Sequence, residues 1–266
     1  MKKMKKRTKA LFSALIVLLI IGCEPSLENP FDPDNPDYVD PETTLVSSIN
    51  DGDLINTSSI VMNWDGNDLS IEYSYKFDDN NWSDWTENTS VEINYIDEGE
   101  HQFSVKSRYE NQIEDQSPAE LSFTVDAVQG PALRIYPLYS EIQSGQSSSV
   151  EIYLEEVDHV RGIEIELNYD PTVVSFQGYN EDDLLNQFNG EVVVINENQS
   201  GSVSITLATI FGDSNGLSGT GSILELSLLG LSPGSTFFEF SSIVFKDSLN
   251  NSITVNDYEN GVVVVK

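Results

Sequence analysis

The stretch Gly162-Ile163-Glu164-Ile165-Glu166-Leu167-Asn168-Tyr169 alternates apolar and polar side chains along its length. In an extended strand, successive side chains point to opposite faces of the sheet. The apolar set therefore faces a core, and Glu164, Glu166 and Asn168 face outward. The alternation predicts a strand of an antiparallel sheet with one buried face and one solvated face.

A second alternating stretch, Gly201–Ala208, predicts a companion strand of the same kind. With its apolar residues turned inward, the outward side chains are those of Ser204, Thr206 and Ala208. Together with Glu164, Glu166 and Asn168, these residues are six candidates for an outward docking face. The alternative is that all six are ordinary solvated strand residues, which are the default on antiparallel sheets.

Residues 132–266 contain ten short strand patterns separated by Gly, Asn and Ser, together with one short helical pattern at 181–187. This count and spacing predict a jelly roll or a related all-β sandwich. The apolar run at 261–265 predicts a terminal strand that is paired on both sides within a sheet. The candidate strands are 133–138, 149–155, 162–169, 173–179, 190–196, 201–210, 221–229, 236–246, 252–255 and 261–265.

Residues 44–128 show six further strand patterns and no sustained helical periodicity. They predict a smaller, immunoglobulin-like β-sandwich, separated from the larger one by Gly130-Pro131. The candidate strands are 44–49, 59–64, 69–78, 90–96, 100–109 and 121–125. The expected fold class is therefore all-β, with two sandwich domains.

The first 43 residues have a different character. Residues 1–22 begin with six Lys and Arg and continue into an apolar run, a pattern typical of an export signal. Residues 23–43 hold five prolines with acids between them, which favours an extended linker. Calcium binding by the acids of this segment is the alternative, but the spacing lacks the glycine and the closing glutamate of an EF-hand loop.

The composition excludes several functions. The chain has 44 acidic and 13 basic residues, a formal charge of −31. Removal of residues 1–22 leaves seven basic residues against the same 44 acids, a charge of −37. Because phosphate-backbone binding needs clustered Lys and Arg, no nucleic acid is expected as a partner.

The residues that enzymes and metal sites use most are scarce. The chain has one cysteine, Cys23, and two histidines, His101 and His159. This excludes an internal disulfide and thiolate zinc sites, and leaves few routes to nucleophilic catalysis. We expect no enzyme activity, no metal site and no cofactor on this chain. Trp82 and Trp85 fit either packing at a sandwich edge or stacking on a sugar ring.

Three family resemblances add to these patterns. Ile20-Ile21-Gly22-Cys23 resembles the cleavage box of bacterial lipoproteins, which implies that Cys23 becomes the lipidated first residue. The segments Tyr73-Ser74-Tyr75, Trp82-Ser83-Asp84-Trp85, Glu98–His101 and Ser117-Pro118-Ala119 resemble three-tyrosine or fibronectin-III-like modules of bacterial surface proteins. The larger sandwich resembles a cohesin domain, through Ser144–Gln146, Ser149–Leu154, Val160–Val174, Gly201–Ala208, Leu217–Leu224 and Asn260–Val264.

The cohesin resemblance implies a non-catalytic receptor for a dockerin module, which carries its own calcium loops and rides on secreted enzymes such as polysaccharide hydrolases. The expected function is an envelope lipoprotein, on the outer membrane or cell surface, that docks a dockerin-type protein partner. Two alternatives stay open: a surface lipoprotein that binds polysaccharide, and a structural component of the envelope.

Overall fold

The computed structural model describes residues 29–188, 190–212 and 216–266, and these divide into two compact units at Asp40 and Pro41. The predicted signal peptide and the lipidation site Cys23 lie outside the described residues. No helix of the described part is long and apolar enough to cross a membrane.

The described part of the predicted linker is not continuously extended. Between Asn29 and Tyr38 it forms consecutive turns, in which backbone N–H groups bond to carbonyl oxygens three residues earlier. Side chains add to these turns, because Asp32 accepts from the N–H of Asp34 and Asn35 accepts from that of Asp37, both at 3.0 Å. Asn and Asp between the prolines thus provide local acceptors that favour turns over an extended chain.

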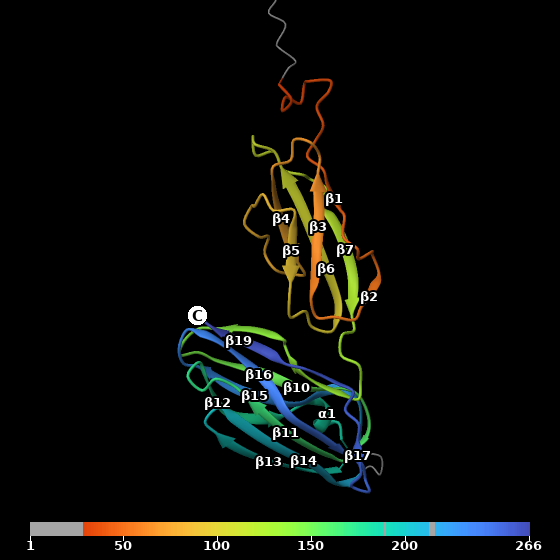
Figure 1. Ribbon diagram of the computed structural model, residues 1–266, viewed down its shortest axis with the longest axis vertical. Coiled ribbons are helices and arrows are strands. Elements are labelled where there is room, and N and C mark those ends of the chain that lie inside the picture. Colours follow the sequence, from red (N-terminus) through yellow and green to blue (C-terminus); the bar gives the residue numbers. More distant parts are fainter. Residues whose placement is uncertain (1–28, 189, 213–215) are drawn as a thin grey trace, which may run out of the picture. The chain divides into compact units, whose positions relative to one another are not determined.

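The first sandwich consists of a three-stranded and a four-stranded sheet (Figure 1). The strands of the first are, in order, β1 (Thr43–Leu45), β3 (Ile60–Gly66) and β5 (Ser90–Ile93). Those of the second are β2 (Asp53–Ile55), β7 (Ala119–Val125), β6 (Gly99–Arg108) and β4 (Glu72–Phe77).

An aromatic cluster fills the space between these two sheets. Trp64 is 1% exposed, and its ring lies 5.9 Å from that of Phe103 and 6.2 Å from that of Tyr73. Ser74, a polar residue of β4, is 1% exposed. Its hydroxyl donates to the carbonyl of Ser83 at 2.8 Å, so the segment after β4 covers this part of the strand.

The second sandwich pairs a five-stranded sheet with a larger one (Figure 1). The five-stranded sheet runs β12 (Val174–Glu181), β15 (Leu217–Gly230), β10 (Ser147–Val160), β8 (Ala132–Tyr136) and β18 (Asp257–Glu259). The larger sheet runs β13 (Gly190–Gln199), β14 (Ser202–Gly212), β11 (Gly162–Asn168), β16 (Gly234–Lys246), β19 (Gly261–Val265) and β9 (Tyr139–Ile142), and β17 (Ser252–Ile253) pairs with β16. One short helix, α1 (Asp183–Asn186), follows β12.

The all-β class is confirmed. All ten strand patterns of the larger sandwich correspond to strands, and α1 lies inside the predicted helical segment. The terminal strand β19 lies between β16 and β9, which explains its continuous apolar run. The strands β2, β9 and β18 were not predicted; each has three or four residue pairs with a parallel neighbour.

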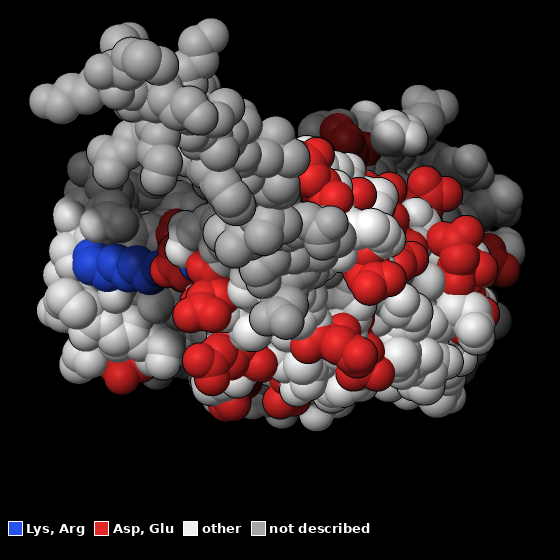
Figure 2. Space-filling model, turned by 90° about the horizontal axis from the view of Figure 1, so that it is seen from above, with Lys and Arg blue, Asp and Glu red and all other residues white. Residues whose placement is uncertain are grey.

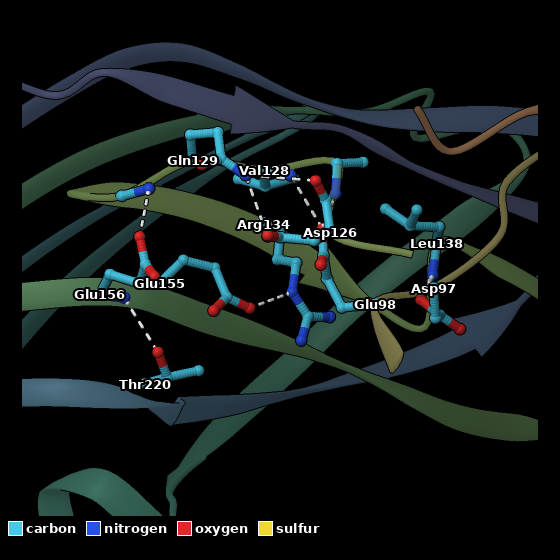
Figure 3. Close-up of polar contacts among 12 residues, drawn as sticks. Asp97, Glu98, Asp126, Val128, Gln129, Arg134, Leu138, Glu155, Glu156 and Thr220 are labelled. Carbon is cyan, nitrogen blue, oxygen red and sulfur yellow. Dashed lines mark hydrogen bonds and ion pairs between the residues drawn. The ribbon is translucent and has the colours of Figure 1, made fainter. Parts of the chain in front are cut away.

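Polar contacts join the two sandwiches around the loop Asp97-Glu98 (Figure 3). The Asp97 carboxylate accepts from the N–H of Leu138 at 2.8 Å, and Ser58 of the first sandwich bonds to Glu259 of the second. Glu98 accepts from the N–H groups of Ala127 and Val128, at 2.9 and 2.8 Å. Hydrogen bonds at several backbone N–H groups therefore fix the segment that connects the sandwiches.

Candidate functional site

The six predicted docking-face residues lie together on one side of the larger sheet. β11 and β14 are antiparallel neighbours, and their register places Glu164 opposite Thr206 and Glu166 opposite Ser204. These four side chains are exposed. Asn168 and Ala208 are half-buried and lie opposite Ser202 and Gly162.

The opposite side of these two strands holds the face in place. Ile163, Leu167 and Val203 are fully buried, and Ile165, Ile205 and Leu207 are at most 4% exposed. They belong to one core cluster that also includes residues of the five-stranded sheet. Because this core is closely packed, the outward side chains stand on a rigid platform.

The face extends onto two strands that sequence reasoning did not include. Thr206 also pairs with Ile195 of β13, and Glu164 also pairs with Val244 of β16. This gives a row across four strands: Ile195, Thr206, Glu164 and Val244. Ile195 is 56% exposed, which places an apolar side chain beside the polar pair. The run Val192-Val193-Val194-Ile195 does not alternate, so local periodicity does not indicate which of its residues point outward.

The electrostatic character of the face is acidic. Among the described residues, none of the Lys, Arg or His side chains forms an ion pair with Glu164 or Glu166. Glu239 of β16 is a third exposed acid, opposite Asn168 in the register. Figure 2 shows one side of the molecule on which acidic side chains are widespread and basic ones occupy a small area. A partner surface that carries Lys or Arg beside apolar residues would therefore complement this face.

Trp82 and Trp85 lie at the first sandwich, in contact with cations. The Lys106 ammonium lies 4.9 Å from the ring centroid of Trp82 and 5.2 Å from that of Trp85, and the Arg108 guanidinium lies 4.4 Å from that of Trp85. Trp82 is 37% exposed, and Trp85 is half-buried. These cation–π contacts give both rings a packing role. Sugar stacking on the two indoles stays a prediction.

Neither histidine belongs to a nucleophilic site. Both ring nitrogens of His101 are engaged at 2.8 Å, Nδ1 by the Asp78 carboxylate and Nε2 by the Asp97 carbonyl. His101 also lines a cavity of about 690 Å³, whose lining residues include no other histidine. A general base needs a nitrogen free to take a proton, so His101 is poorly placed for that role.

The second histidine is also poorly placed to activate a nucleophile. His159 Nδ1 lies 2.6 Å from the Asp158 carboxylate, and Ser218 donates to that same carboxylate at 3.0 Å. A serine nucleophile is activated by a hydrogen bond to the histidine rather than to the acid. Across the described ranges, no group of three or more His, Cys, Asp or Glu side chains is placed to hold a metal ion.

Comparison with known proteins finds a family model that matches part of the chain. Residues 138–265 match the family model of the cohesin domain. No curated protein matches the chain.

Several solved cohesins resemble the chain. One is a non-cellulosomal cohesin from the archaeon Archaeoglobus fulgidus, with 21% identity and a TM-score of 0.43 over 51% of this chain and 90% of that one. Another is the sixth cohesin of scaffoldin B from Acetivibrio cellulolyticus, solved in complex with a dockerin, with 18% identity and a TM-score of 0.42 over 52% and 100%. A third belongs to a type I cohesin–dockerin complex from Clostridium thermocellum, with 13% identity and a TM-score of 0.42 over 51% and 98%.

The outward face built by β11, β13, β14 and β16 lies wholly within residues 138–265, the segment that matches the family model of the cohesin domain.

Proposed function

We propose that this chain is a non-catalytic lipoprotein of the bacterial cell envelope that displays its cohesin domain to a dockerin-type protein module. The outward row Ile195, Thr206, Glu164 and Val244 carries the proposal. It combines the exposed Ile195 and the half-buried Val244 with a carboxylate that has no ion-pair partner among the described residues, on a sheet backed by a packed core. Protein interfaces typically have an apolar centre with charges that select the partner.

The partner brings the calcium in this proposal. Dockerin modules carry paired calcium loops, whereas the described residues of this chain form no cluster suited to a metal. Docking is therefore expected to be lost when EGTA removes calcium from the partner. The fold of this chain is expected to be unchanged by the same treatment. Far-ultraviolet circular dichroism with and without EGTA separates the two effects.

The direct test is calorimetric titration of the full chain with the dockerin modules encoded in the same genome. Thr206→Arg introduces bulk and charge at the centre of the row, and Glu166→Arg reverses one charge beside it. Each is expected to weaken docking by about 2 kcal/mol or more, the range of interface hot spots. Rising ionic strength is expected to slow association of the wild type, because opposite charges steer the encounter.

A matched control changes the same charge elsewhere in the domain. Glu181 of β12 is exposed on the five-stranded sheet, so Glu181→Arg is expected to leave docking unchanged. If no dockerin binds, or if Glu181→Arg weakens binding as much as Glu166→Arg does, the proposed face is wrong.

The membrane attachment is a separate part of the proposal. The sequence Ile20-Ile21-Gly22-Cys23 supports lipidation of Cys23. A chain with a formal charge of −37 would be repelled by anionic lipids, so acyl chains are the reasonable means of attachment. Metabolic labelling with a fatty acid is expected to mark the wild type and not Cys23→Ala. Unlabelled wild-type protein released into the medium would contradict the anchor.

A further inference from the structure

A polar pocket lies on the five-stranded sheet, away from the docking face. It has a volume of about 370 Å³ and is lined by residues of β8, β10, β15 and α1, with Glu98 from the first sandwich. Arg134 is paired with Tyr153 across β8 and β10. Two residues further along the same strands, Tyr136 is paired with Glu151. Because the inward residues Ile135 and Ile152 are fully buried between these positions, the four side chains share the outward side of the sheet.

Arg134 is the most unusual group in the wall of this pocket. It is 5% exposed, and its Nε donates to Glu155 at 2.5 Å (Figure 3), yet its buried Nη1 has no hydrogen-bond partner among the described residues. A buried donor without an acceptor costs about 1–3 kcal/mol, more for a charged group. Such a group calls for an acceptor that the described residues do not supply.

Two tyrosine rings flank this guanidinium. Its central carbon lies 4.1 Å from the ring centroid of Tyr153 and 5.2 Å from that of Tyr136. Tyr136 is 37% exposed, so part of its surface is open to a ligand. An amphipathic aromatic ring with an open face suits a molecule that has both C–H surface and polar groups.

The remaining groups of the lining indicate which ligand charge the pocket favours. Besides Arg134, the lining holds three carboxyl groups, those of Glu98, Glu151 and Asp183. They outnumber Arg134, whose charge is already paired with Glu155, and so they disfavour an anion. An ammonium or guanidinium ligand has donors only, and would leave Nη1 of Arg134 without an acceptor.

A hydroxyl group meets both requirements, because it donates to a carboxylate and accepts from a guanidinium. Ser222, Thr220 and Gln187 add further polar groups to the lining. We propose that this pocket binds a neutral, polyhydroxylated ligand, a pyranose unit of a polysaccharide, with Tyr136 against the ring and Glu151 and Arg134 at its hydroxyls. The inference does not depend on dockerin binding, since the pocket and the docking face belong to different sheets.

The test is ligand-observed NMR with the full chain in a buffer free of sugar-headed detergent. The probes are cellobiose, xylobiose and mannobiose, with glucuronic acid as the anionic probe and the peptide Gly-Lys-Gly as the cationic one. At least one neutral disaccharide is expected to bind at millimolar concentration or below. Tyr136→Ala and Glu151→Gln are each expected to weaken that binding by about tenfold.

Matched controls are available on the docking sheet. Tyr139 is 41% exposed, similar to Tyr136, and Glu164 is an exposed strand carboxylate. Tyr139→Ala and Glu164→Gln are expected to leave sugar binding unchanged, and Trp82→Ala separates this pocket from the indoles of the first sandwich. If Tyr136→Ala does not fold, Glu151→Gln carries the test, because it preserves shape.

Three results would overturn the proposal. The first is that none of the neutral disaccharides binds, so that Arg134 has no sugar acceptor. The second is that only glucuronic acid or only the lysine peptide binds, which would make the ligand an anion or a cation. The third is binding that Trp82→Ala abolishes and that both pocket variants retain.

Discussion

The buried ion pair between Arg134 and Glu155 gives the sharpest test of the second sandwich. The two side chains are 6% and 9% exposed, and Arg134 also contacts the rings of Tyr136 and Tyr153. Arg134→Ala removes all of these contacts at once and leaves the Glu155 carboxylate buried without its cation. Breaking one partner of a buried pair typically costs about 3–5 kcal/mol.

That cost corresponds to a measurable shift in melting temperature. A sandwich of roughly 135 residues unfolds with an entropy near 0.28 kcal/mol/K, so the expected decrease is about 10–18 °C. The double variant Arg134→Met, Glu155→Leu removes both charges and retains apolar volume. It is expected to be within about 1 kcal/mol of the wild type or more stable, because no charge is then left buried.

Two optical probes make the result specific to one sandwich. All three tryptophans, Trp64, Trp82 and Trp85, lie in the first sandwich, so intrinsic fluorescence reports on that domain. Circular dichroism reports on both domains. Arg134→Ala is expected to move the dichroism transition of the second sandwich by the full amount and the fluorescence transition by less. A loss below about 1 kcal/mol, or a double variant as unstable as the single one, would refute the reasoning.

Three further predictions concern the pH dependence and the packing of the fold. Burial raises the pKa of Glu98 and Glu151 above their ordinary 4.5, so the folded chain holds these protons more tightly than the unfolded chain. Their contribution to stability is complete below about pH 4.5 and is lost as the pH rises through the raised pKa values. Urea titrations are expected to show a decrease in stability as the pH rises above about 4.5, which Glu98→Gln with Glu151→Gln flattens; an unchanged slope would contradict this. Gly261→Ala places a methyl group 2.5 Å from Cγ2 of the fully buried Ile135. The free energy of unfolding, measured by thermal unfolding, is expected to decrease by about 1–3 kcal/mol. A neutral effect would show that Ile135 can move aside. Leu167→Ala opens a cavity directly beneath the docking face and is expected to cost about 2–5 kcal/mol by the same measurement; a loss below about 1 kcal/mol would mean that the strand collapses into the space.

The sequence predicted the strands that alternate, because alternation records which face is buried. Residues 162–169 and 201–208 each have one polar side and one apolar side, and in the structure the predicted outward residues are exposed or half-buried. β2, β9 and β18 were missed for the opposite reason. Each is a short strand paired in parallel, and its identity depends on a neighbour distant in sequence rather than on its own pattern.

The candidate site was predicted in part for a related reason. Ile195 lies in a continuous apolar run, so only its pairing with Thr206 shows that it belongs to the outward face. The surroundings of Arg134 could not be predicted from the sequence either. Glu155 lies 21 residues away on a neighbouring strand, and Glu98 lies in another domain. Such groups meet through the topology of the sheets, which local periodicity does not specify.

The two proposed sites divide the cohesin domain between its sheets. The docking row lies on β13, β14, β11 and β16, whereas most of the pocket around Arg134 and Tyr136 lies on β8, β10 and β15. One closely packed core separates them, and it includes Ile163 and Leu167 from one sheet and Ile152 and Leu224 from the other. Coupling between two sites requires an element that has two alternative arrangements. A closely packed core has a single arrangement. We therefore expect a sugar in the pocket and a protein partner on the docking row to bind independently of each other.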